Sequence, residues 1–251
     1  MAQLNGWPAK VLEHPMSPTA AGLLTLERAA AVLDQAENET TPERCHRAAE
    51  GLAAQLDELA PERLGEDLAR EIRRWIEYLD GLAHRDGVDA QKVERLRSLL
   101  EQLERRLQED WGDYFQRLTH DPWLAAYRPG SAEDPGFRPE PFAWAILGPE
   151  ESGTRLARWR EGLAPMRTAA ETGLRLMRDA LHRKRVDCPP QGYSLELPGE
   201  HASGLVRVED FGKYIPELRP EGNGLRLRFR QPVELVPVTE PVPATLGWFT
   251  L

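Results

Sequence analysis

The sequence predicts an α+β protein: an N-terminal helical bundle built around one long central helix, followed by a small antiparallel β-sheet domain. Two observations lead to this prediction. Up to about residue 184, apolar side chains recur at intervals of three and four, which is typical of amphipathic helices. After Arg185 the period falls to two, in short runs separated by Gly, Pro and Asn, which is typical of antiparallel hairpins. We therefore expect a helical domain at residues 1–184, with an extended arm at 1–17, and a β-domain at residues 185–251.

The extended arm contains two prolines, Pro8 and Pro15, around Val11 and Leu12. Proline disfavours both helix and central strand, so the arm reads as a short extended segment. We expect it to lend one strand to a sheet formed later in the chain.

Three helices follow the arm, and proline marks the start of each. The first begins at Pro18 and stops in the polar cluster after Glu37. The second begins at Pro42, because Thr40 or Thr41 supplies a capping hydroxyl and proline suits the first helical turn; it runs to about residue 59. The third runs from Pro61 to about residue 86, where Asp-Gly ends it.

The long central helix is predicted from Val88 to Leu118, with Asp89 as its cap. At 1.5 Å per residue it would be about 45 Å long, so its apolar stripe needs cover along its whole length. Other helices of the same bundle or a second subunit could supply this cover, and the periodicity is compatible with both. The stripe consists of Val93, Leu96, Leu100, Leu103, Leu107, Trp111, Tyr114, Phe115 and Leu118.

The remaining elements follow from turn residues and the change of period. Prolines and glycines predict a loop at residues 119–140. Helices are expected at 141–147 and 149–163, and a last one opens at Pro165. The predicted strands are 193–197, 205–208, 225–229, 233–238 and 246–251.

Composition limits the class of function. The net charge of −9 disfavours nucleic-acid binding, which usually needs a basic surface. No run of 18 apolar residues is present, so we expect no membrane insertion, and the N-terminus lacks the regions of a signal peptide. These features predict a cytoplasmic protein. Cys45 and Cys188 lie in different kinds of sequence and are not expected to form a disulfide.

The sequence gives little evidence for a catalytic or metal-binding site. The six histidines never fall at the spacing of a zinc motif, and no nucleophile motif accompanies His120-Asp121. We therefore expect no metal, no cofactor and no enzymatic activity. A small-molecule pocket between the two domains, as in an enzyme, is the weaker alternative.

The segment at residues 225–230 gives the clearest indication in the sequence of a binding role. Alternation places Leu225, Leu227 and Phe229 on one face and three arginines on the other, at a spacing of about 6.6 Å. Such a row of guanidinium groups can hold an acidic peptide. Alternatively, the arginines pair with neighbours such as Glu196 or Glu234 and form an ordinary solvated face. The arginines are Arg226, Arg228 and Arg230.

Several stretches, in order along nearly the whole chain, resemble the ZapD family of bacterial division proteins, which associate with the tubulin-like GTPase FtsZ. The order and separation of these stretches make coincidence improbable. In the helical part they are VLEHPM from Val11, LLTLER, GVDAQKVERLRSLLEQL, and the pattern Trp159, Leu163, Pro165, Met166, Ala169 and Leu174. In the β-part they are Gly192-Tyr193, Leu205-Val206-Arg207, Tyr214-Ile215-Pro216-Glu217, and Leu227-Arg228-Phe229 with Pro232.

This resemblance implies a non-enzymatic, cytoplasmic homodimer at the division site. It implies that the protein binds the C-terminal tail of FtsZ and cross-links or bundles FtsZ filaments. Basic residues are the family's expected contacts for the tail. Arg128, Arg207 and Arg228 stand where the family pattern also has arginine, so they are expected to contribute to binding together with Arg226 and Arg230.

The chain also departs from the family pattern. Residues 17–25 contain no charge, and Thr25 takes the place of an expected arginine. The loop at 119–140 keeps Arg128 and Arg138 but has gained acidic residues. If tail binding depends on the lost charges, either the site has moved towards the arginine row or the affinity is lower. A further alternative is an adaptor of the same fold with another partner.

Overall fold

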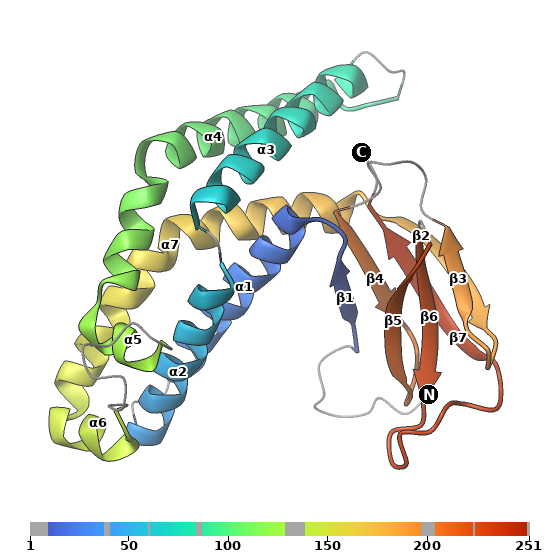
Figure 1. Cartoon of the computed structure of the whole chain (residues 1–251). Coiled ribbons are helices and arrows are strands. Elements are labelled where there is room, and N and C mark those ends of the chain that lie inside the picture. The colour runs from blue at the N-terminus through green and yellow to red at the C-terminus, as the bar shows by residue number, and fades with distance from the viewer. Residues whose placement is uncertain are drawn as a thin grey trace. The chain divides into compact units, whose positions relative to one another are not determined.

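The computed structural model describes residues 10–37, 41–59, 61–83, 87–128, 139–196, 204–222 and 224–249 (Figure 1). The chain divides into two compact units. The helical unit contains residues 22–174. The β unit contains the described residues up to Ala21 together with those from Arg175 onward. Helices and antiparallel strands occur in the order predicted for an α+β fold.

The first four helices begin where the capping residues predict. In α2, the Thr41 hydroxyl accepts a hydrogen bond from the Arg44 amide. In α4, the Asp89 carboxylate accepts from the amides of Gln91 and Lys92. These contacts confirm both predicted starts. The helices are α1 (Pro18–Glu37), α2 (Pro42–Glu58), α3 (Pro61–Ala83) and α4 (Ala90–Thr119).

The stripe of the long helix α4 is largely covered within the chain. α3 packs along α4 as an antiparallel partner (Figure 1). The side chains of Trp111 and Tyr114, predicted on the same stripe, lie outside the described part. The buried members are Val93, Leu100, Leu103, Leu107, Phe115 and Leu118.

A short helix, α5 (Pro122–Tyr127), lies within the predicted loop at 119–140, so the expectation of loop throughout was wrong. Asp121 starts it, because its carboxylate accepts hydrogen bonds from the amides of Trp123 and Leu124. α5 and α6 (Pro141–Leu147) pack against α2. The rest of the predicted loop, residues 129–138, lies outside the described residues.

The last helix, α7 (Pro149–Asp179), is continuous, which corrects the predicted break before Pro165. Proline lacks the N–H that would bond to the carbonyl four residues earlier, so it usually ends or kinks a helix. Here Leu163 and Met166 on either side of it are both buried. Burying these two side chains favours continuation of the helix by more than the missing hydrogen bond costs.

The β unit contains two antiparallel sheets with one core between them (Figure 1). The four-stranded sheet has the order β1-β4-β7-β2, and the three-stranded sheet has the order β3-β6-β5. Residues of both sheets meet in one cluster that includes Val208, Leu227, Phe229 and Leu246. The strands are β1 (Leu12–Pro15), β2 (His182–Cys188), β3 (Tyr193–Glu196), β4 (Leu205–Glu209), β5 (Ile215–Glu221), β6 (Gly224–Arg230) and β7 (Val242–Trp248).

The predicted N-terminal strand is confirmed, because β1 pairs with β4 in the register Leu12 to Val208. Other strand predictions were wrong. Residues 182–184 of β2 were placed in the helical domain, and neither β2 nor β5 was among the predicted strands. Residues 233–238 form a loop rather than a strand. The strand expected at 246–251 begins earlier, at Val242, and its last two residues lie outside the described part.

Candidate protein-binding surfaces

The arginine row lies on the outer face of the three-stranded sheet, as the alternation predicted. Leu225, Leu227 and Phe229 are buried in the core of the β unit, whereas the intervening arginines of β6 point outward. The paired strand β5 places Glu217 and Glu221 on the same outer face. This face therefore carries both positive and negative side chains and is not a purely basic patch.

Two of the three arginines are engaged within the sheet. Arg226 Nη1 lies 2.5 Å from a Glu221 oxygen, and its Nε and Nη2 donate to the Gln191 carbonyl. Arg230 Nε donates to Glu217 at 3.1 Å, and its Nη1 donates to the Leu235 carbonyl at 2.8 Å. The carboxylate partners are thus Glu221 and Glu217, not Glu196 or Glu234 as the alternative interpretation supposed.

Arg228 is the exception in this row. Its side chain is exposed, and within the described part of the chain it forms no ion pair. It lies opposite Glu217 in the strand register, but that carboxylate already binds Arg219 and Arg230. Its guanidinium donors therefore face solvent.

The acidic partners are ionised at neutral pH. Hydrogen bonds from Arg219 and then Arg230 lower the pKa of Glu217. The Ser194 hydroxyl, followed by Arg226, lowers the pKa of Glu221. Both carboxylates thus remain charged and hold their arginines in place.

A tight turn supports the stems of the arginines. Gly192 has φ +104°, and a Cβ there would come within 2.9 Å of Arg226 Nε and of Arg228 Cγ. Only glycine accommodates both this backbone conformation and this close approach. The turn therefore lies directly against the side chains of Arg226 and Arg228.

Arg207 lies on the other sheet. Its neighbours Val206 and Val208 point into the core between the sheets, so Arg207 points to the outer face of the four-stranded sheet. There it lies 3.3 Å from Glu13 and 2.5 Å from Glu209. Arg178 makes a two-armed contact with the same Glu13, at 2.6 and 2.8 Å. This network ties β1 to β4 and to the end of α7.

Arg128 belongs to the helical unit. It ends α5, and its Nε lies 2.5 Å from Asp57 of α2. The five arginines proposed from the sequence therefore do not form one cluster: three share a sheet face, Arg207 lies on the opposite sheet, and Arg128 lies in the helical unit.

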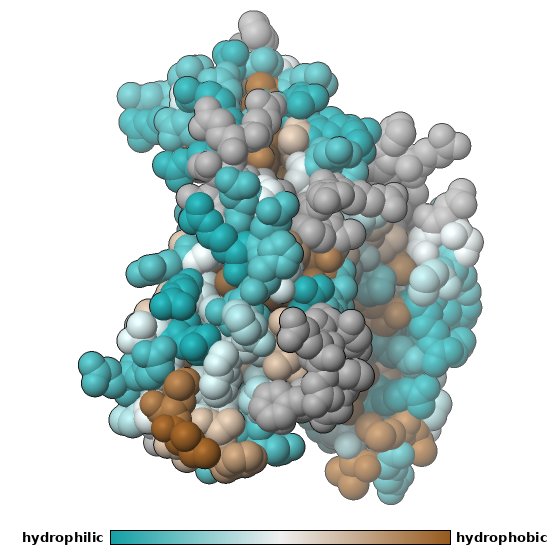
Figure 2. All heavy atoms as spheres, turned by 60° about the vertical axis from the view of Figure 1, so that its left-hand side comes forward, coloured by the Kyte–Doolittle hydropathy of each residue, from teal (hydrophilic) through white to brown (hydrophobic). Residues whose placement is uncertain are grey.

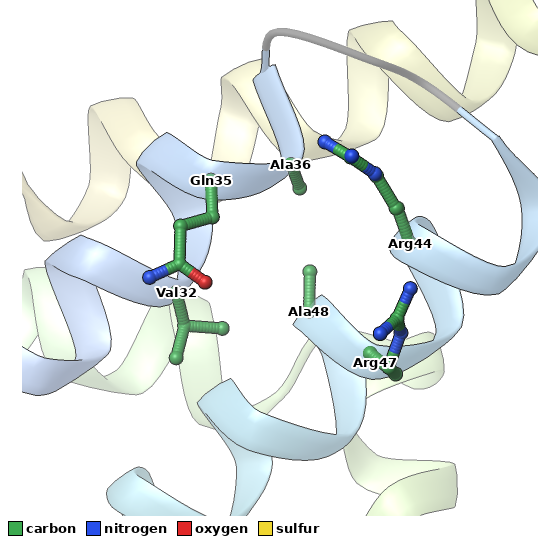
Figure 3. Close-up of a pocket in the computed structure, with 6 residues that line it drawn as sticks. All are labelled: Val32, Gln35, Ala36, Arg44, Arg47 and Ala48. Atoms are coloured by element: carbon green, nitrogen blue, oxygen red, sulfur yellow. The ribbon is translucent and has the colours of Figure 1, made fainter. Parts of the chain in front are cut away.

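The helical unit also has an open pocket of about 470 Å³ between α1 and α2, which the sequence reasoning did not find (Figure 3). Figure 3 shows Val32 and Gln35 on one side and Arg44 and Arg47 on the other, with Ala36 and Ala48 between them. Guanidinium and amide groups next to small apolar side chains suit a carboxylate-bearing ligand. The only sequence signal for this pocket was the i, i+3 spacing of Arg44 and Arg47. This spacing places both side chains on one face of the helix but does not indicate what that face contacts. The described lining is Val32, Gln35, Ala36, Arg44, Arg47 and Ala48.

Neither thiol is arranged for chemistry. Burial raises the pKa of both Cys45 and Cys188, which disfavours the reactive thiolate.

Among the described residues, no group of three His, Cys, Asp or Glu side chains could hold a metal ion. No helix in this part of the chain combines the length and apolar character needed to cross a bilayer.

The fold and its surfaces define an α+β protein with a helical unit and a two-sheet β unit whose outer face displays arginine. The family model of ZapD, described as a cell division protein, matches residues 24–227, and the chain belongs to this family. It is 26% identical over 226 residues to the cell division protein ZapD of Ralstonia nicotianae, an alignment that spans 87% of this chain and 89% of that relative. The resemblance noted in the sequence is thereby confirmed, and the membership supports a role in cell division.

Proposed function

We propose that the protein binds the C-terminal tail of FtsZ and cross-links FtsZ filaments at the division site in the cytoplasm. Family membership supports the cell division role. The observation that favours tail binding is Arg228, an exposed guanidinium group without an ion pair in the described structure, held on a rigid strand. A charged donor of this kind can bind a peptide carboxylate.

Cross-linking follows if two copies associate. A twofold homodimer presents two equal tail sites, so one dimer can bridge two filaments. Because many tails lie along each filament, weak individual contacts combine into strong attachment. We therefore propose that the protein acts as a homodimer and that bundling requires both sites.

Co-sedimentation with GTP-assembled FtsZ from the same organism tests this function. The protein should pellet with intact FtsZ and remain in the supernatant with FtsZ that lacks its C-terminal tail. Pelleting with neither form, at low salt and high protein concentration, would contradict the proposal and would favour an adaptor with a different partner. Electron microscopy of the pellet would show whether the filaments are bundled.

Reversing the charge of Arg228 should weaken this binding. In Arg228→Glu, the guanidinium donor is replaced by a carboxylate that repels the ligand, and we expect affinity for the tail to fall about tenfold or more at low salt. Isothermal titration with a synthetic tail peptide measures the change. The effect should shrink as salt rises, since exposed charges are screened.

A matched control is Arg158→Glu, which makes the same charge change on an exposed position of α7 in the helical unit. It should leave tail affinity unchanged. If both variants lose affinity equally, the effect reflects net charge and not the site. If the circular dichroism spectrum of Arg228→Glu instead shows loss of the folded structure, Arg228 is required for folding of the sheet.

A further inference from the structure

The loop between β6 and β7 exposes aliphatic side chains. Residues 231–238, here called the aliphatic loop, include Val233, Leu235 and Val236 with exposed fractions of 91%, 55% and 40%. Figure 2 shows an apolar patch at the lower end of the β unit, where Figure 1 places this loop. Single exposed aliphatic residues are ordinary, but three within four positions are typical of an interaction site.

This loop is held by specific hydrogen bonds. The Gln231 amide donates to the Val236 carbonyl at 2.9 Å, and the Leu235 amide donates to the Gln231 carbonyl at 3.0 Å. The Val238 amide donates to the Phe229 carbonyl, which returns the chain to β6. The aliphatic side chains are therefore displayed on a fixed backbone, so little conformational entropy is lost when a partner binds.

The backbone at Leu235 is strained. Its φ is +56°, a region that a large side chain seldom occupies. The Leu235 carbonyl accepts a hydrogen bond from Arg230 of the arginine row, which stabilises this conformation. Strained positions that the surrounding structure maintains cluster at functional sites.

A pocket of about 570 Å³ adjoins the aliphatic loop. Its size is within the range of ligand pockets and suits a large apolar side chain. Tyr214 and Val238, which pack against the core of the β unit, form part of its wall, and Val233 lies beside them. Lys213 also lines it, with Nζ 5.8 Å from the Tyr214 ring centre. The described lining is Lys213, Tyr214, Gln231, Pro232, Val233, Glu234, Val238, Thr239 and Glu240.

The aliphatic loop and the arginine row are continuous. Arg230 donates to the loop at Leu235 and pairs across the sheet with Ile215, which is itself partly exposed. Arg228 is two residues further along β6, about 6.6 Å away, on the same face. An extended peptide can therefore reach both the apolar loop and the exposed guanidinium group.

The charges around the loop indicate which partner fits. Glu234 and Glu240 lie beside the aliphatic side chains, and their charges disfavour contact with an anionic lipid surface, which would bring many negative charges against them. They also repel a carboxylate placed at the loop itself, so the acidic group of a bound peptide has to lie away from them, at Arg228. Lys213 lines the pocket, and Arg228 lies two residues before Arg230 on the same face of β6; both side chains attract carboxylates. A protein segment that combines an apolar side chain with nearby acidic groups is thus favoured over a membrane.

We propose that the aliphatic loop and Arg228 form one binding surface for an extended peptide with a large apolar side chain roughly two to four residues from a carboxylate. The apolar side chain enters the pocket beside Tyr214 and Val233, and the carboxylate meets Arg228. This inference rests on the proposed function, because it takes the FtsZ tail as that peptide.

Fluorescence anisotropy with a labelled synthetic peptide of the FtsZ tail tests the proposal. The variant Val233→Ser with Val236→Ser removes apolar surface from exposed positions and should keep the fold. We expect its affinity to fall about tenfold while its salt dependence matches that of the wild type. The control is Ile146→Ser, which alters a side chain of α6 that is 80% exposed and should bind like the wild type.

A double-mutant cycle locates the contact. Replacing the large apolar residues of the peptide with serine, one at a time, should identify one whose loss costs little further affinity in the loop variant. If the wild type binds the peptide and the loop variant binds equally well, this inference fails and the proposed function stands. If the wild type binds neither the peptide nor FtsZ filaments, both fail.

Two other occupants of the loop are tested with the same variant. Sedimentation with vesicles of phosphatidylethanolamine and phosphatidylglycerol should detect no binding by the wild type. Analytical ultracentrifugation should give the same oligomeric state for the wild type and the loop variant. Vesicle binding or a change of oligomeric state that disappears with the loop side chains, with peptide binding intact, would overturn the proposal.

Discussion

Replacing Gly224 with alanine should separate β3 from β6 and lower the free energy of unfolding by about 3 kcal/mol. A Cβ at Gly224 would lie 2.0 Å from the Leu195 carbonyl oxygen and 3.3 Å from the Glu196 Cα. These are backbone atoms of the paired strand, so they cannot move aside without loss of the ladder. Urea denaturation followed by circular dichroism measures the change.

A matched control for this substitution is Gly81→Ala. Gly81 lies in α3, and no heavy atom approaches within 4 Å of a Cβ built there. Alanine at an open helical position should therefore raise the stability by about 0.5 to 1 kcal/mol. If Gly224→Ala is as stable as the wild type, the close approach of β3 to β6 is not as described. Because Arg228 lies on β6, we also expect Gly224→Ala to lose tail binding.

The helices could be predicted because their signals are local. Thr41 and Asp89 each cap a helix through amides two or three residues away, and both contacts are present. Pro165 misled the prediction, since its local effect on the backbone is outweighed by burial of Leu163 and Met166, which only the packed unit supplies.

The strands were harder to predict because edge strands lack an apolar signature. β2 reads HRKRVDC, with most side chains exposed, and its register with β7 defines it rather than its propensity. β5 contains Pro216 and Pro220, and proline is disfavoured in a central strand, but at the sheet edge alternate amides need no partner. Conversely, the β-prone residues of the aliphatic loop expose their side chains and form no strand.

The candidate site shows the same division between local and long-range information. Alternation along β6 predicted which face its arginines occupy, because that depends only on the strand. It could not predict that Glu217 and Glu221 would engage Arg230 and Arg226 and leave Arg228 exposed, because that depends on the register with β5. Arg207 is a stronger case, since its partner Glu13 is 194 residues away in sequence.

Replacing Glu13 with alanine should lower the free energy of unfolding by about 2 to 3 kcal/mol, because it leaves Arg178 and Arg207 without their shared carboxylate. All three side chains are at least partly buried, so solvent screening relieves only part of this loss. Since Glu13 lies in β1, the arm should also become more susceptible to proteolysis. Urea denaturation and limited proteolysis measure the two effects.

Combining this change with Arg207→Ala distinguishes a structural role for Arg207 from a binding role. If Arg207 acts through Glu13, each single variant is destabilised and the double variant loses less than the sum, because the second substitution removes a group that has already lost its contact with Glu13. Tail affinity, measured below the unfolding transition, should then be unchanged in Arg207→Ala. A stable Arg207→Ala variant with weaker tail binding would contradict this and would place Arg207 at the FtsZ contact, despite its position on the sheet opposite the arginine row.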